Sequence, residues 1–247
     1  MKQQEDFDIM EMPFEGLAAY WLSLRKLLDA KGQSVLDEEI QYTQEPFIRH
    51  VLEITFSSLD AALVRKLSNV KRDAILADYN RKIELMRLAL YAMAAGENPR
   101  VTLVRMNSKF PTPPMPEKAA FDMAHGIASS IKNKDADIKT LLSVNHKLNA
   151  EQLLVKLLFH IMHSRRNSRQ ALEKMLKFHD YPFFISGMEL VIDGFEADFL
   201  AHNLQDTRDN IIDEAKRKME MSVEMSLGIR HKLSYDDLFR VARSYML

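Results

Sequence analysis

The chain has 247 residues, of which 47% are hydrophobic and 28% are charged, a composition typical of a globular protein. Its 35 acidic and 34 basic side chains nearly cancel, which argues against a global electrostatic attraction to nucleic acid or acidic lipid. Cysteine is absent, so disulfides and thiolate metal sites are excluded.

Apolar runs in the sequence are short. The most apolar one, residues 153–162, is interrupted by Lys156 and His160 and falls well below the roughly 18 residues that a membrane span requires. The first ten residues lack the basic and apolar regions of a signal peptide. We therefore expect a soluble, cytoplasmic protein without membrane insertion.

The first third of the chain predicts helices separated by clear turn signals. Good helix formers fill the runs between these signals, and only 7 glycines are present. Gly32 suits the left-handed position after a helix end, and a short helix is expected over 35–42. Pro46 then opens a third helix, because proline is tolerated in a first helical turn.

The middle of the chain, residues 96–148, predicts a partly helical linker. Four prolines between 110 and 116 predict an extended, semi-rigid segment. Residues 102–105 fit a short strand or a coil equally well. Two short helices are expected over 117–132 and 137–144.

The last third repeats the pattern of the first. Asn149 with Gln152 forms a capping-box pattern before a helix whose apolar residues recur at helical spacing. A short helix over 170–178, a helix opened by Pro182 and a break at Asp193-Gly194 follow. A long charged helix begins near residue 196, and Ser234 caps a final helix over 235–246.

An internal repeat underlies this pattern. Residues 15–88 align with residues 151–224 without a gap, and we count 14 identical pairs among the 74. They include Pro46/Pro182, Arg72/Arg208 and Glu84/Glu220. We interpret the chain as all-α, with two tandem helical domains related by internal duplication: copy 1 (1–95), the Pro-containing linker (96–148), and copy 2 plus a C-terminal helix (149–247). Two unrelated amphipathic helix arrays are the alternative.

Three stretches of copy 2 resemble segments of a known protein family. His163-Ser-Arg-Arg-Asn-Ser-Arg-Gln-Ala-Leu-Glu173 resembles the A-R-R-E-G-x-x-A-L-E segment of MotA-type flagellar stator subunits. The segment 182–194, P-F-F-I-S-G-M-E-L-V-I-D-G, is similar to that family's P-F-x-x-x-G-L-x-L-V-V-D-G. A long charged helix follows in both. The resemblance extends from Asn149 to about Leu227 and corresponds to the cytoplasmic domain of the family.

The resemblance implies two residues that would face the rotor of the flagellar motor. In the family an arginine and a glutamate of this domain face the switch-complex protein, and they fall on Arg165 and Glu173 here. Copy 1 carries Asp29 and Asp37 at these positions, and Ser168 replaces the family's turn glycine. The membrane spans are missing, so the chain is not expected to conduct ions.

The candidate protein-binding residues are Arg165, Arg166, Arg169 and Glu173, and each has a plainer interpretation. The role of the three arginines could be simply to stabilise a helix end through its dipole. Glu173 could simply pair with Arg169 or Lys177, one helical turn away. Nucleic-acid binding by the arginines is less favoured, because no aromatic platform accompanies them.

Catalytic, cofactor and metal sites are not expected. The sequence has no Ser/His/Asp set, no phosphate-binding glycine loop and no cluster of metal ligands. His160 and His163 are spaced to present two ligands, but His160 falls among core residues, so we interpret it as a core histidine.

These observations predict a MotA-like, non-enzymatic component of the bacterial flagellar motor. It would bind a rotor switch protein or stator subunits through charged helical faces, at a peripheral position on the motor. Nucleic acid is not an expected partner, and a homo-oligomer is left open. The alternative is a general helical scaffold or adaptor unrelated to motility.

Overall fold

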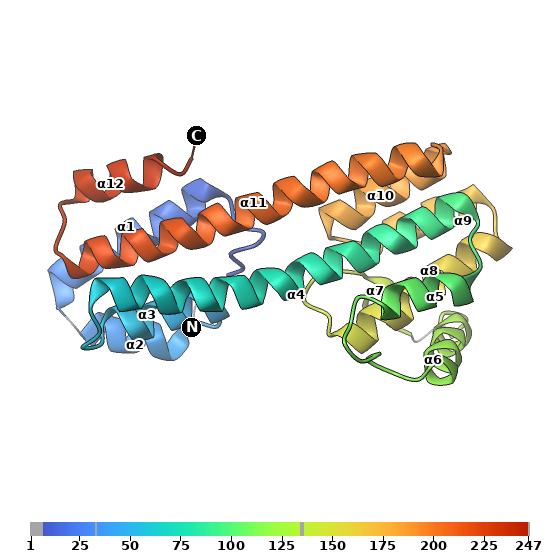
Figure 1. Ribbon diagram of the computed structural model, residues 1–247, viewed down its shortest axis with the longest axis horizontal. Coiled ribbons are helices and arrows are strands. Elements are labelled where there is room, and N and C mark those ends of the chain that lie inside the picture. The colour runs from blue at the N-terminus through green and yellow to red at the C-terminus, as the bar shows by residue number, and fades with distance from the viewer. Residues whose placement is uncertain (1–6, 33, 134–135, 247) are drawn as a thin grey trace. The chain divides into compact units, whose positions relative to one another are not determined.

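The structure, a computed structural model, describes residues 7–32, 34–133 and 136–246, without the side chains of residues 169 and 170. All regular elements in this part are helices, which confirms the all-α prediction (Figure 1). In chain order they are α1 (Phe14–Lys31), α2 (Ser34–Tyr42), α3 (Pro46–Thr55), α4 (Ala61–Ala95), α5 (Pro99–Asn107), α6 (Glu117–Ser130), α7 (Ile138–Leu142), α8 (Ala150–Arg166), α9 (Arg169–Leu176), α10 (Pro182–Asp193), α11 (Ala197–Arg230) and α12 (Tyr235–Arg243). None of these helices is long and apolar enough to cross a bilayer.

The helices group into two compact units, and the two long helices contribute to both. The boundary falls between Ala77 and Asp78 in α4 and between Asn210 and Ile211 in α11. The first unit holds α1–α3, the start of α4, the end of α11, and α12; the second holds the remainder. The predicted division into 1–95, 96–148 and 149–247 rests on similarity between sequence segments. Grouping the helices by their contacts in space does not test that similarity, so the division stays a prediction.

The first unit is built around the buried face of α1. Leu17, Trp21 and Leu24 are almost fully buried there, and the indole Nε1–H of Trp21 donates to Ser222 Oγ at 3.2 Å. The start of α3 is fixed as the sequence predicts, with Pro46 in its first turn and the Glu45 carboxylate accepting the Ile48 N–H at 2.6 Å.

The second unit is built around α8. The predicted capping box is present, since Asn149 and Gln152 each accept the other's backbone N–H. The helix is buried from Leu153 to Met162 except for the half-buried Lys156, and both α5 and α6 pack against it. The segment expected to be a linker therefore supplies part of this unit's core, including Ala120 and Ala124 of α6.

One expectation for the middle segment is wrong. Residues 102–105 form neither strand nor coil but lie within α5. The Asn98 side chain accepts the Arg100 N–H at 2.9 Å, and Pro99 occupies the first turn, so the helix start has a local cause. Thr102 is fully buried, and its hydroxyl donates to Glu97 at 2.6 Å.

In each unit, an arginine and a glutamate that are identical between the aligned segments form an ion pair between the long helices. In the first unit, Arg72 of α4 pairs with Glu220 of α11 at 2.8 Å. In the second unit, Arg208 of α11 pairs with Glu84 of α4 at 3.0 Å. The same bond is therefore made twice with the two helices exchanging roles, and each arginine also pairs with the aspartate that follows it.

Three pairs of corresponding helices also start at a constant offset, the one that aligns residues 15–88 with residues 151–224. Helix α3 begins at Pro46 and α10 at Pro182, α4 begins at Ala61 and α11 at Ala197, and α1 begins at Phe14 and α8 at Ala150. The four helices of each set follow in the same order and have similar lengths.

A glycine contact sets the spacing of α10 and α4 in the second unit. A Cβ at buried Gly187 would overlap the side chain of Leu90, which is also fully buried. Gly187→Ala is therefore expected to destabilise the protein by about 1–3 kcal/mol in urea unfolding, because the core must overpack. Gly126→Ala is the matched control, since nothing lies near that exposed helix position, and it should stabilise by roughly 0.5–1 kcal/mol. Equal effects of the two changes would contradict the close packing.

A candidate protein-binding cleft in the second unit

The predicted arginines lie at the exposed end of a buried helix. Arg165 and Arg166 occupy the last turn of α8, and both are exposed. The apolar residues of α8 fix the helix in the core, so its charged end has a defined position. A last-turn position also satisfies the plainer interpretation, in which the cations offset the negative end of the helix dipole.

The same two arginines line a cavity of about 470 Å³ in the second unit. Its other walls come from α6 and from the start of α5. Its lining residues are Asn98, Pro99, Arg100, Phe121, His125, Met162, Arg165 and Arg166. Three guanidinium groups and an imidazole thus meet in one cleft, and no acidic residue is among the described lining residues.

Neighbouring contacts hold this cleft together. An Nη1–H of Arg165 donates to the Glu97 carbonyl at 3.5 Å, which links the end of α8 to the α4–α5 turn. The Glu97 carboxylate is engaged by Arg105 at 2.8 Å as well as by Thr102. Arg100 forms an exposed ion pair with Glu117 at 3.3 Å, which solvent and salt will weaken.

Such a set of groups can bind a carboxylate or another oxyanion. Guanidinium groups donate two parallel hydrogen bonds to a carboxylate, which gives geometric selectivity as well as attraction. The first N–H groups of α5 add a positive partial charge at the same wall. Phe121 and Met162 provide apolar surface beside the charges, as protein interfaces commonly do.

The remaining predicted residues are placed less fully. Arg169 begins α9, but its side chain lies outside the described residues. Glu173 is exposed on α9 and is not among the cleft residues. The ammonium group of Lys177, one of its expected partners, lies 5.0 Å from the centre of the Phe178 ring.

Sequence reasoning missed Arg100, Phe121 and His125. The Asn98-Pro99 pair signals a helix start that would have placed Arg100 in a first turn. Phe121 and His125 are four residues apart on α6 and therefore share a face, but nothing local indicates that this face meets the end of α8.

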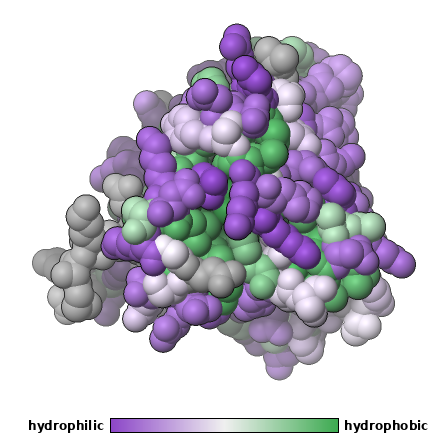
Figure 2. Space-filling model, turned by 90° about the vertical axis from the view of Figure 1, so that its left-hand side faces the viewer, coloured by the Kyte–Doolittle hydropathy of each residue, from purple (hydrophilic) through white to green (hydrophobic). Residues whose placement is uncertain are grey.

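The corresponding position in the first unit carries the opposite charge. Asp29 aligns with Arg165 when residues 15–88 are placed over residues 151–224, and it lines a separate cavity of about 670 Å³. Its carboxylate pairs with Arg25 at 2.6 Å. Figure 2 looks onto this end of the first unit, where apolar side chains in the middle are surrounded by polar ones. The three-arginine cleft is therefore not repeated at this position.

His160 of α8 and His179, which follows α9, form a buried cluster. His160 is fully buried, which confirms its interpretation as a core residue, and its ring Nε2 lies 3.1 Å from the Leu142 carbonyl. The rings of His160 and His179 are 4.9 Å apart, and both contact Phe184. Burial lowers the pKa of His179 to about 4 and that of His160 well below its usual value, so both stay neutral near pH 7.

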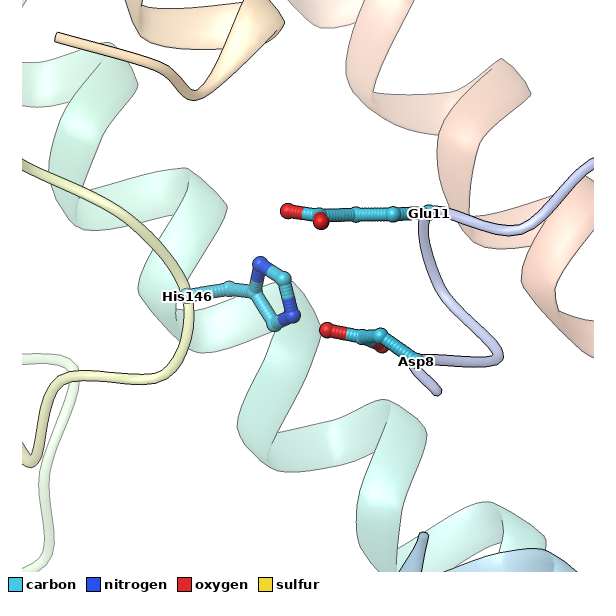
Figure 3. A group of neighbouring side chains, drawn as sticks. All are labelled: Asp8, Glu11 and His146. Atoms are coloured by element: carbon cyan, nitrogen blue, oxygen red, sulfur yellow. The ribbon is translucent and has the colours of Figure 1, made fainter. Parts of the chain in front are cut away.

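Asp8, Glu11 and His146 are metal-ligating residue types, but they belong to different units. Figure 3 draws Asp8 and Glu11 on the segment before α1, in the first unit, and His146 on the segment between α7 and α8, in the second. We assign no metal site to them.

Comparison with known proteins gives no relative: no family model, no curated protein and no solved structure matches the chain.

Proposed function

We propose that this chain is a MotA-like, protein-binding component of the bacterial flagellar motor, which docks an acidic face of a rotor switch protein or stator subunit into the cleft of the second unit. The observation that carries the proposal is the convergence of Arg165 and Arg166 with Arg100 in one cavity. Arg165 and Arg166 come from the stretch that resembles the stator family.

Internal duplication supports the resemblance. Four helices recur in the same order, three of them at one constant offset, and residues identical between the copies make the same contact twice. A duplicated sequence would retain Arg72, Arg208 and their glutamate partners because each bond stabilises one unit. On this interpretation the chain carries two copies of a stator-like cytoplasmic domain.

The two copies would then differ in their binding surfaces. Copy 2 carries Arg165 in a cleft lined by three arginines and one histidine, whereas Asp29 of copy 1 is held by Arg25. Docking to an acidic partner is therefore assigned to copy 2. A general helical adaptor outside motility would use the same cleft for an unrelated acidic protein, and it remains the second candidate.

A charge-reversal variant tests the docking. Arg165→Glu combined with Arg166→Glu should weaken binding to a purified rotor switch protein or stator cytoplasmic domain at least about tenfold at low salt, because attraction becomes repulsion. Raising the salt concentration should shrink the difference. The measurement is an affinity titration at two salt concentrations.

The matched control reverses two lysines outside the cleft. Lys118→Glu with Lys132→Glu makes the same change in net charge on exposed positions of the second unit. It should change the affinity less than threefold, by roughly 0.6 kcal/mol or less. Equal weakening by both pairs would show that only net charge matters. Unchanged affinity in the cleft variant would refute the docking.

A further inference from the structure

A second cavity, of about 610 Å³, lies in the first unit, between the segment before α1, the body of α1 and the end of α2. Its volume falls within the range of pockets for small organic ligands. Phe7, Tyr20, Leu24 and Leu27 contribute apolar wall. The rings of Phe7 and Tyr20 lie 5.0 Å apart between centroids and form an aromatic side of the cavity.

A carboxylate of α2 is fixed at this cavity. The Tyr20 hydroxyl donates to Glu39 Oε1 at 2.8 Å, and the Thr43 hydroxyl donates to the same oxygen at 3.1 Å. Among the described residues no donor reaches Glu39 Oε2. The carboxylate is thus oriented by two protein bonds and retains an oxygen that can accept from a ligand.

The charged side chains among the described residues that line this cavity are acidic. Asp8, Glu11 and Glu39 are its charged lining residues, and no described Lys, Arg or His lines it. Lys218, which donates to the Met10 carbonyl of the same segment at 3.3 Å, is already paired with Glu214 at 2.6 Å. An apolar cavity that presents the oriented carboxylate of Glu39 favours a cation that carries an apolar body.

We propose that this cavity binds a small organic ammonium ion, with the ammonium group donating to Glu39 and an alkyl or aryl body lying against Phe7, Leu24 and Leu27. The aromatic side adds cation–π attraction for the same charge. A primary ammonium fits best, because it supplies N–H donors for Glu39 Oε2 as well as positive charge. This site lies in the first unit and does not depend on docking at the arginine cleft of the second.

Tyr20 suits binding rather than proton transfer. Burial and the adjacent negative charge of Glu39 raise the pKa of Tyr20 well above the ordinary value of a phenol. Its hydroxyl therefore stays protonated and continues to orient Glu39 over the whole physiological pH range.

Calorimetric titration of the intact chain with n-octylammonium, octanol and octanoate tests the proposal. These probes share a chain length and differ in charge. Octylammonium should bind saturably and at least tenfold more tightly than octanol, and octanoate should not bind at the same concentrations. The fluorescence of Trp21, the single tryptophan, should change with the same midpoint, since its ring lies 5.2 Å from that of Tyr20.

Two neighbouring carboxylates on α2 give the matched variants. Glu39→Gln should weaken octylammonium binding about tenfold, whereas exposed Glu38→Gln, which does not line the cavity, should change it less than twofold. Octanol binding as tightly as octylammonium, or equal effects of the two variants, would overturn the proposal. The comparison of probes on the unaltered chain keeps the test decisive if Glu39→Gln unfolds the protein.

Discussion

Glu84→Ala is expected to destabilise the protein by about 3–5 kcal/mol, because it leaves a group of partly buried cations without their carboxylate. The Glu84 side chain is only 9% exposed and pairs with Arg87 at 2.7 Å, Arg208 at 3.0 Å and Lys109 at 3.2 Å. Burial opposes its ionisation, but hydrogen bonds and charges from Arg87 and Lys109 outweigh that cost and lower the pKa of Glu84 to about 2. Urea unfolding at pH 7 measures the loss.

Glu220, which aligns with Glu84 in the sequence, provides the control. Glu220 makes the equivalent bond to Arg72, but its side chain is 34% exposed. Glu220→Ala should therefore cost about 1 kcal/mol or less, as exposed ion pairs do. Similar losses for the two variants would contradict the central role of Glu84 in the second unit.

Acidification from pH 7 to pH 5 should destabilise the second unit through its buried histidines. The pKa values of His160 and His179 are lowered in the folded state, so the unfolded chain binds more protons as the pH falls. The stability contributed by the neutral histidines is fully present above their pKa in the unfolded chain, near 6.5. It is lost as the pH falls toward their pKa in the folded protein, which is about 4 for His179. His179 alone accounts for about 2 kcal/mol at pH 5, and His160 adds to it.

Replacing one histidine isolates this contribution. His179→Phe removes the titrating ring from an aromatic cluster, and neither ring nitrogen of His179 has a hydrogen-bond partner in the described part of the chain. Between pH 7 and pH 5, the free energy of unfolding in urea should fall by about 2 kcal/mol less in His179→Phe than in the unaltered protein. His202→Gln, at a side chain that is 83% exposed and lies outside the cluster, is the matched control. An unaltered slope in His179→Phe would contradict this account.

Glu45 and Glu84 change the stability over other pH ranges, or in the opposite direction, and their effects must be distinguished from that of the histidines. Burial raises the pKa of Glu45, in the first unit, to about 7, so its contribution to stability falls as the pH rises from about 4.5 to 7. Glu84 loses its stabilisation only as the pH falls below about 4.5 toward 2. The histidine effect therefore dominates the second unit between pH 7 and pH 5.

Local signals in the sequence predicted most helix boundaries. Pro46, Pro182 and Asn149 each open a helix where expected, and Ser234 accepts the Asp237 N–H at the start of α12. These starts are predictable because caps and prolines act within one turn. Helix α5 was missed although Asn98 and Pro99 carry the same kind of signal, because its short apolar run also fits a strand.

Contacts between distant segments could not be predicted in the same way. The identity of Arg72 with Arg208 and of Glu84 with Glu220 is visible in the sequence, but the exchange of partners requires two long helices side by side. The cleft likewise depends on the end of α8 meeting the start of α5. Periodicity indicates which face of a helix is apolar, but it does not indicate which helix covers that face.

Site-specific photo-crosslinking in flagellated cells tests the central claim most directly. A photoreactive residue placed at Arg166 should give a cross-linked product that contains a rotor switch protein or a stator subunit, identified by mass spectrometry. The same residue placed at exposed Lys66 of the first unit should not. Cross-links from position 166 only to proteins outside the motor, or no difference between the two positions, would contradict the claim that this cleft docks the chain to the flagellar motor.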